Sequence, residues 1–239
     1  MAISFATILG TRSTVDGSSF VTASGAPTGN RLQLFAVSAI NAAASTPAAP
    51  TLSGGGITTW TEVTSIAYDT GGSNRGRITL FRALEASPGS GTVTITFGES
   101  HTNCEWSWCE FDGIDTGGTN GANAIVQSAT NSATATSLTV TLAAFGSADN
   151  ATYGAFTHQA NEATTVGTGF TQIHNPFGAS RVASTLTEYL LGNDTSVDAS
   201  WTTSSLCGGI AVEIKAAAGA SDPSAGPSWI VQRGVIYLP

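Results

Sequence analysis

Apolar and polar residues alternate with a period of two along many short segments of this chain. In Thr92–Phe97 (TVTITF), the side chains of Val93, Ile95 and Phe97 fall on one face and the three threonines fall on the other. Leu138–Leu142 repeats the pattern. This alternation predicts strands with one buried face and a threonine face that is solvated or lightly covered, as in a two-layer sandwich.

Strand signals of this kind recur along the whole chain, and turn clusters rich in Gly, Asn, Asp, Ser and Pro separate them. No amphipathic segment of 10 to 15 residues lies between them, which argues against alternating strands and helices. We therefore predict an all-β fold, an antiparallel two-layer β-sandwich of the jelly-roll or lectin-like kind with a short C-terminal extension. The predicted strands are Ser4–Thr11, Arg31–Ile40, Thr58–Tyr68, Arg75–Leu84, Thr92–Phe97, Cys104–Phe111, Ala124–Ala129, Leu138–Leu142, Ala151–His158, Phe170–His174, Ser180–Leu191, Ala199–Thr202 and Gly208–Lys215.

Two of these strands carry glutamates. In Gly208–Lys215 the alternation places three aliphatic residues inward and Glu213 and Lys215 outward. In Cys104–Phe111 it places Glu105 and Glu110 on opposite faces. Glycoside hydrolysis needs two carboxyl groups flanking one bond, and Glu105 and Glu110 therefore cannot supply them.

Aromatic residues are the other candidates for a binding role. Trp106 and Trp108 share a face of the same strand, where a place in the core is favoured over a sugar-binding platform. A carbohydrate-binding module would instead use exposed rings, and Trp60, Trp201 and Tyr68 are the candidates for stacking on host glycans. We expect Trp60 and Trp201 to be strand residues that contribute to the core.

The composition changes near the C-terminus. We predict a sandwich domain over residues 1–216, a linker of Ala, Gly, Ser and Pro over residues 217–228, and an apolar C-terminal docking segment, Trp229–Pro239. The segment can fold back on its own sandwich or bind a neighbouring chain. A neighbouring chain is favoured, because a strand that completes its own sheet does not need such a linker. Its predicted docking residues are Trp229, Ile230, Val231, Val235, Ile236, Tyr237 and Leu238.

Charge and composition narrow the classes of partner. Only 10% of the 239 residues are charged, the formal net charge is −8 and Lys215 is the single lysine, so no basic cluster is present for binding phosphates. We expect no nucleic-acid partner. The longest apolar run, Leu32 to Ala44, is interrupted by polar residues and is too short for a membrane span. The first residues lack the pattern of a cleaved secretory signal, which predicts synthesis in a cytoplasm.

Catalytic and metal-binding patterns are weak. The spacing of Cys104, Cys109 and Cys207 matches no zinc motif, and a Cys109–Cys207 bridge is left open. His101, His158 and His174 have no metal-ligand spacing, and we expect them in solvated loops or in satisfied polar contacts. Neither a nucleophile elbow nor a phosphate-binding loop appears; Gly54–Gly56 is interpreted as a turn between strands. We predict no catalytic residues, cofactor or metal.

A loop calcium site is a minor alternative. Asp112, Asp115 and Asn120 form one possible ligand group, and Asp194 and Asp198 form another. Neither group has the spacing of a calcium-binding loop.

Several motifs in order carry a resemblance to a known class of domain. They are NRLQLFAVS (Asn30–Ser38), GGGITTWTEV (Gly54–Val63), SPGSGTVTITF (Ser87–Phe97), WCEFDGID (Trp108–Asp115) and, further on, DASWTTS followed by GGIAVEIKAA. This succession resembles β-sandwich domains of tailed-bacteriophage virion proteins, which occur in capsid decoration proteins, head fibres and tail proteins. The resemblance covers roughly residues 1–217 and brings no catalytic residues with it.

The resemblance implies a function. We expect a non-enzymatic virion structural protein, a capsid decoration protein or head fibre, made in the host bacterial cytoplasm and located in the virion. Its partners would be other capsid or tail subunits, and it would assemble as a homo-oligomer through subunit contacts and its C-terminal tail or N-terminal strand. The alternative is a tail-associated or carbohydrate-binding adhesion module that recognises host surface glycans.

Overall fold

The computed structural model describes residues 2–41, 46–69, 75–177 and 184–218. Part of the predicted linker, residues 219–228, and the whole C-terminal docking segment lie outside the described residues. So do the seven docking residues predicted from the sequence. Within the described part, no helix has the length and hydropathy that a membrane span requires.

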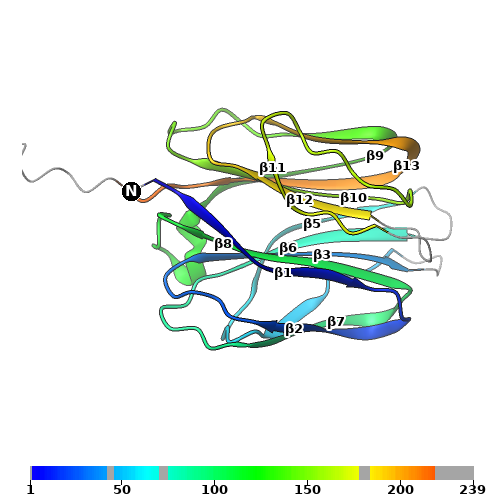
Figure 1. The fold of residues 1–239 in the computed structure, drawn as a ribbon, viewed down its shortest axis with the longest axis horizontal. Coiled ribbons are helices and arrows are strands. Elements are labelled where there is room, and N and C mark those ends of the chain that lie inside the picture. Colours follow the sequence, from blue (N-terminus) through cyan, green and yellow to red (C-terminus); the bar gives the residue numbers. More distant parts are fainter. Residues whose placement is uncertain (1, 42–45, 70–74, 178–183, 219–239) are drawn as a thin grey trace, which may run out of the picture.

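The strands form three antiparallel sheets stacked in layers (Figure 1). The middle sheet has the order β1-β8-β3-β6-β5 and the upper sheet has the order β11-β12-β10-β13-β9. The lower sheet has the order β2-β7-β4. The middle-sheet strands are β1 (Ser4–Ser13), β3 (Leu32–Asn41), β5 (Thr61–Tyr68), β6 (Arg75–Ala83) and β8 (Asn103–Asp112). The upper-sheet strands are β9 (Ile125–Thr141), β10 (Ala151–His158), β11 (Thr171–His174), β12 (Ser184–Leu190) and β13 (Ser196–Ile214), and the lower-sheet strands are β2 (Gly17–Gly25), β4 (Thr51–Gly54) and β7 (Gly91–His101).

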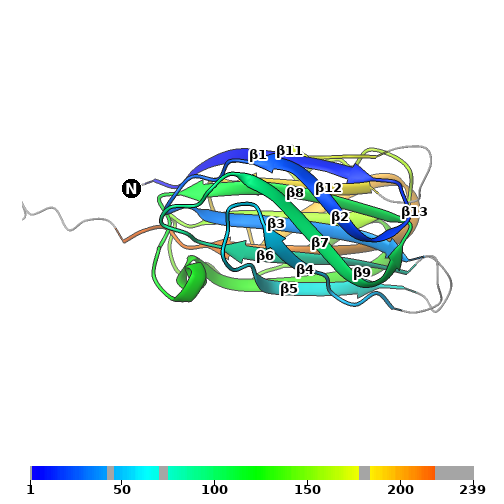
Figure 2. The same ribbon diagram turned by 90° about the horizontal axis from the view of Figure 1, so that it is seen from below.

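The all-β antiparallel sandwich predicted from the sequence is confirmed, and the structure adds the lower sheet to it. The strands of the lower sheet run obliquely across the middle sheet (Figure 2). The sequence pattern did not reveal two of its three strands. β2 is rich in Gly and Ser, with bulges on either side of its centre, and β4 has only four residues. Neither offers enough alternation to detect.

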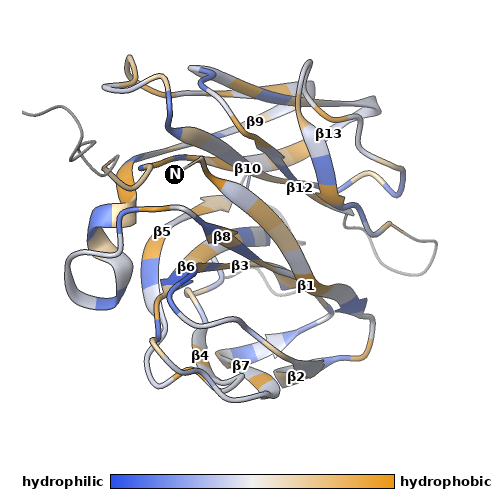
Figure 3. Cartoon of the chain, turned by 60° about the vertical axis from the view of Figure 1, so that its left-hand side comes forward, coloured by the Kyte–Doolittle hydropathy of each residue, from blue (hydrophilic) through white to orange (hydrophobic). Residues whose placement is uncertain are grey.

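The middle sheet is buried on both faces. Leu34, Ile78 and Phe111 are among its side chains that pack against the upper sheet. Phe35 and Trp108 are among those that pack against the lower sheet. Every residue of β3 is buried as a result, which explains its nearly continuous apolar sequence. Along the other strands, apolar residues are interspersed with polar ones (Figure 3).

The two longest strands of the upper sheet form a ribbon, and the folded-over part of this ribbon covers the outer face of the other strands of that sheet. β9 and β13 pair along their length, with an irregularity in β13 between Ser200 and Ser205. The ribbon folds over there, and the Asn131 side chain of β9 donates across the bend to the Thr139 carbonyl of the same strand at 2.8 Å. Leu138 and Val197 thereby pack on Phe156 and Leu186 in a third apolar core. The prediction of two separate strands in each of these regions was wrong, because Thr- and Ser-rich sequence continues the strand through the bend.

The short 3₁₀ helix η1 (Thr119–Ala124) is held by one asparagine. Asn120 adopts a φ of 53°, and its Oδ1 accepts a hydrogen bond from the Leu84 amide at 2.8 Å. Its Nδ2 donates to the Thr59 carbonyl and to the Thr61 hydroxyl, each at 2.9 Å. The Asn120 side chain is therefore used to fix η1 on β5 and β6, and is not available as a calcium ligand.

The ends of the described chain lie at one end of the sandwich, together with η1 (Figures 1 and 2). Ile114 and Ala216 form a β-bridge, and the Ala217 amide donates to the Gly113 carbonyl at 2.8 Å. A Cβ atom at Gly113 would meet the carbonyl of Ala2. We call this part of the molecule the terminal end.

The triple glycine forms a turn at the edge of the lower sheet, as predicted. Gly54, Gly55 and Gly56 have φ values of 84°, 75° and 73°, and the Gly55 amide donates to the Thr92 carbonyl at 2.8 Å. A Cβ at Gly56 would collide with the carbonyl group of Gly89. Only glycine meets both requirements.

Replacement of this glycine tests the turn. We expect Gly56→Ala to lower the free energy of unfolding by about 2 kcal/mol or more, because the substitution adds left-handed strain and a backbone collision. Gly98→Ala is the matched control, because nothing lies within 4 Å of its added Cβ, and it should change stability by at most about 1 kcal/mol. Urea unfolding of both variants measures the difference. Equal stabilities would contradict the turn geometry.

Candidate functional site

A pocket of about 760 Å³ opens at the terminal end. This volume is within the range of ligand-binding sites. Its walls come from η1, the start of β9, the loop before β10 and the last described residues. The lining residues are Asp115, Ala122, Asn123, Ile125, Val126, Gly146, Ser147, Asp149, Asn150, Glu213, Lys215, Ala216, Ala217 and Ala218. We call it the terminal pocket.

One wall of the terminal pocket is a buried glutamate. Glu213 has no exposed surface, and its carboxylate accepts hydrogen bonds from Gln127 Nε2 at 2.6 Å and from Asn150 Nδ2 at 2.5 Å. The Oδ1 atom of Asn150 accepts the Ala216 amide at 3.0 Å. The strand alternation correctly places Glu213 on the outer face, but that face is covered here. The network ties the backbone at Ala216, close to where the described chain ends, to the β10 side of the pocket.

A second wall is an ion pair between the loop before η1 and the end of β13. Lys215 Nζ lies 2.8 Å from Asp115 Oδ2, and the Gly117 amide donates to Asp115 Oδ1 at 2.8 Å. The hydrogen bond from Lys215 holds the pKa of Asp115 below its ordinary value. The ion pair therefore ties the loop before η1 to the end of β13.

The remaining lining combines apolar surface with acidity. Val126 is 49% exposed, and Ala122, Ile125 and the last three described alanines line the pocket with it. Asp149 lies on the exposed rim, so the pocket carries three acidic side chains against one lysine. None of its described lining residues is aromatic, so the described part of the pocket offers no ring on which a sugar would stack. The arrangement is suited to binding an apolar group that carries a positive charge.

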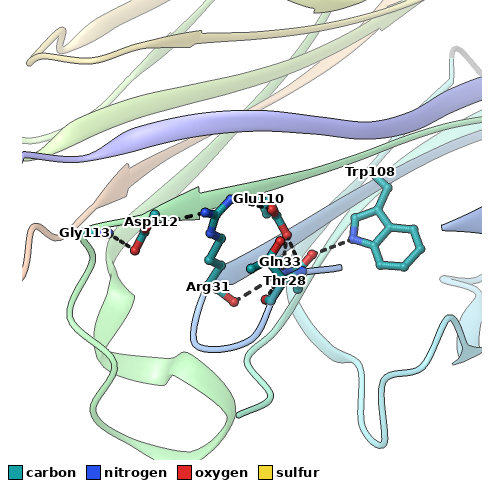
Figure 4. A network of polar contacts seen from close by, with 7 residues as sticks. All are labelled: Thr28, Arg31, Gln33, Trp108, Glu110, Asp112 and Gly113. Carbon is teal, nitrogen blue, oxygen red and sulfur yellow. Dashed lines mark hydrogen bonds and ion pairs between the residues drawn. The ribbon is translucent and has the colours of Figure 1, made fainter. Parts of the chain in front are cut away.

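Near the end of β8, a buried carboxylate fixes the loop that leads into β3 (Figure 4). Glu110 accepts hydrogen bonds from the Thr28 amide at 2.8 Å, Arg31 Nη1 at 2.7 Å and Gln33 Nε2 at 3.1 Å. Gln33 in turn accepts from Trp108 Nε1 at 2.9 Å. Burial alone would raise the pKa of Glu110, but these donors hold it below the ordinary value. Glu110 is therefore a structural anion.

Glu105 faces the upper sheet, opposite to Glu110, as predicted from the alternation. Burial raises its pKa to about 7, which the Thr185 and Asn103 side chains and the Arg12 charge offset only in part. Arg12 Nη1 is 4.0 Å from Glu105 Oε1, and Asn103 Nδ2 is 3.5 Å from it. The glutamates do not flank a common space, in agreement with the argument against a glycosidase pair.

A fourth buried carboxyl group, Glu188, was not singled out from the sequence. It lies on the outer face of β12, where the ribbon covers it, and burial raises its pKa to about 8. The Gly167 amide donates to one of its oxygens at 3.0 Å, and the charges of Asp198 and Asp194 raise its pKa further. The alternation of β12 (STLTEYL) could have assigned Glu188 to a face, but it could not show that this face is covered.

The aromatic candidates are engaged inside the protein. Trp106 and Trp108 belong to the core between the middle and lower sheets, as predicted. Trp201 is buried, donates to the Ala135 carbonyl at 3.0 Å and stacks on His158. Tyr68 is buried, and its hydroxyl lies 3.1 Å from that of Thr157. Trp60 is half-buried, and it precedes β5 instead of lying in a strand as predicted.

The histidines are more enclosed than predicted. His101 is fully buried at the end of β7 against the Phe97 ring, and its Nδ1 lies 3.0 Å from the Glu99 carbonyl. Of the two predicted settings, one ring nitrogen therefore has the polar contact and the solvated loop does not apply. His158 is in a satisfied polar contact: its Nε2 lies 2.9 Å from the Thr164 hydroxyl, and burial lowers its pKa to about 4. His174 is half-buried, and its ring packs against Gly10. Burial lowers the pKa of all three.

All three cysteines are free and buried, so the Cys109–Cys207 bridge is not formed. Cys104 and Cys109 pack on opposite faces of β8, as expected from their spacing. Among the residues that the structure describes, no group of three or more His, Cys, Asp or Glu is placed to hold a metal ion. In the two loop alternatives for calcium, Asp112 and Asp194 each accept a nearby backbone amide, from Gly113 and Ser196 respectively.

Comparisons of this chain with models of protein families, with curated proteins and with solved structures found no match.

Proposed function

We propose that this chain is a non-enzymatic structural subunit of a bacteriophage virion, a capsid decoration protein or head fibre, that assembles as a homo-oligomer through its C-terminal docking segment. One observation carries the proposal. The described chain leaves the sandwich at the terminal pocket, so that the linker begins at a concave acidic surface at one end of the molecule. A segment tethered there starts at one end of the molecule, where a neighbouring subunit has access to it.

The internal chemistry of the sandwich is consistent with a structural role. The carboxylates of Glu110 and Glu213 each accept hydrogen bonds from two or more donors inside the protein. Lys215 forms an ion pair with Asp115. Such networks fix loops and strands and favour a single rigid arrangement. The motif succession quoted above remains the only support for a virion as the location.

Particle composition tests the proposal. Phage particles are purified from a host strain that produces this chain, and their proteins are identified by mass spectrometry. A strain in which the gene encodes residues 1–218 supplies the comparison. The deletion stops after Ala218 because Ala216 and Ala217 make backbone hydrogen bonds to the sandwich.

We expect the full chain in the particles and the shortened chain only in the soluble fraction, folded. Full incorporation of the shortened chain would refute anchoring by the C-terminal docking segment. Absence of the full chain from purified particles would refute the virion role itself.

A further inference from the structure

We propose that the terminal pocket is the receptor for the C-terminal docking segment of a second copy of this chain. This inference rests on the proposed function and names the surface that the segment would contact. Three features support it: the position of the pocket, the chemistry of the pocket and the segment, and the length of the linker between them.

The C-terminal docking segment is tethered at the terminal pocket. Ala216, Ala217 and Ala218 line the pocket, and the chain continues from there for 21 residues. Ten residues, 219–228, separate this point from Trp229. Such a linker reaches at most about 35 Å, which is enough to cross to a neighbouring molecule. A segment destined for its own pocket would already be at its site and would not need this length.

The chemistry of the docking segment matches that of the pocket. The docking segment, WIVQRGVIYLP, is apolar apart from Gln232 and Arg233, and it contains no acidic residue. The pocket offers an exposed apolar surface at Val126 and an excess of acidic groups, among them the rim residue Asp149. Apolar side chains of the segment would cover Val126, and Arg233 would meet Asp149.

The tether makes the geometry head-to-tail. If each chain gives its segment to the next and receives one in its own pocket, the contact is heterologous, and it closes into a ring when the rotation between copies allows it. Each copy has one donor segment and one pocket. A trimer or larger ring fits this arrangement as well as a reciprocal dimer.

Cysteine cross-linking of the full-length chain tests the contact. One batch carries Val126→Cys in the pocket and another carries Ile230→Cys in the segment; the native cysteines are buried and do not compete. The two are mixed and oxidised with diamide, a two-electron oxidant for a pair of thiols. The control mixture replaces Val126→Cys with Leu191→Cys, because Leu191 is exposed to a similar degree, 52%, but does not line the pocket.

We expect a disulfide-linked heterodimer from the Val126→Cys mixture, in at least about tenfold higher yield than from the control mixture. Equal yields from both mixtures would overturn the proposal. A chain carrying both substitutions that forms only an internal disulfide, with no heterodimer from the mixture, would assign the segment to its own pocket and also overturn it.

A charge exchange gives an independent measurement. Asp149→Arg and Arg233→Asp should each weaken oligomer formation by about tenfold, and the chain carrying both should recover most of the loss. If the full chain oligomerises but neither the cross-link nor the recovery is seen, the segment binds elsewhere and only this inference fails. If the full chain is a monomer, the proposed assembly fails with it.

Discussion

Replacement of Glu110 by alanine is expected to destabilise the protein by about 3 kcal/mol or more. The variant leaves the Thr28 amide and the side chains of Arg31 and Gln33 without their shared acceptor at a buried position. Arg31 would keep only its longer contact to Asp112. The Thr28 amide and Gln33 would lose their short bonds to a carboxylate, so each loss costs free energy. Gln33 is also the partner of Trp108. Urea unfolding at pH 7 measures the loss.

Asp112→Ala is the matched control. Asp112 contacts the same arginine, at 3.6 Å, but its side chain is 37% exposed. Solvent screens such a pair, and we expect a loss of at most about 1 kcal/mol. Similar losses for the two variants would show that the Glu110 network does not stabilise the loop that leads into β3. A shift in the slope of the unfolding curve would point to a changed denatured state instead.

Stability is expected to fall by about 2 kcal/mol between pH 6.5 and pH 8.5. Glu188 and Glu105 have folded-state pKa values of about 8 and about 7, both raised above the ordinary value of 4.5 by burial. The folded protein therefore holds protons that the unfolded chain has already released. Their contribution to stability is complete below pH 4.5 and is lost as the pH rises through the folded-state pKa.

The histidines act in the opposite direction. Burial lowers the pKa of His101, His158 and His174, so their contribution to stability is complete only above about pH 7.5 and is lost as the pH falls through the ordinary value of 6.5. Because about half of each histidine in the unfolded chain is protonated at pH 6.5, the three together offset about 1 kcal/mol of the fall caused by the glutamates. The histidines contribute equally to the wild type and to the glutamine variants, so a comparison of variants isolates the two glutamates. We expect Glu188→Gln to remove about 2 kcal/mol of the fall and Glu105→Gln to remove less than about 1 kcal/mol.

Urea unfolding of the wild type and both variants at the two pH values gives the comparison, since the difference between pH values cancels the direct cost of each substitution. An unchanged fall in Glu188→Gln would mean that Glu188 is ionised in the folded protein. If the stability of the wild type does not fall, both Glu188 and Glu105 are ionised in the folded protein.

The sequence predicted the fold class because the alternation of apolar and polar residues directly reports a half-buried strand. It placed Glu105 and Glu110, and Cys104 and Cys109, on opposite faces of β8, which the structure confirms. It missed β2 because a strand with bulges and a Gly- and Ser-rich sequence has little pattern to detect. It also split β9 and β13, since nothing local shows that a strand continues through a bend.

The candidate site was less accessible to sequence reasoning. Alternation gives the face of a residue, but it does not give what covers that face. Glu188 and Glu213 lie on outer faces that the folded ribbon and its neighbours bury, and only long-range packing creates those environments. The terminal pocket likewise joins η1, the start of β9 and the end of β13, which are far apart along the chain. No local motif marks such a meeting of segments.

The solution mass of the full-length chain beside residues 1–218, measured by light scattering at equal concentrations, tests assembly through the C-terminal docking segment most directly. We expect a defined oligomer for the full chain and a folded monomer for residues 1–218. Monomers in both cases, or the same oligomer in both, would contradict it.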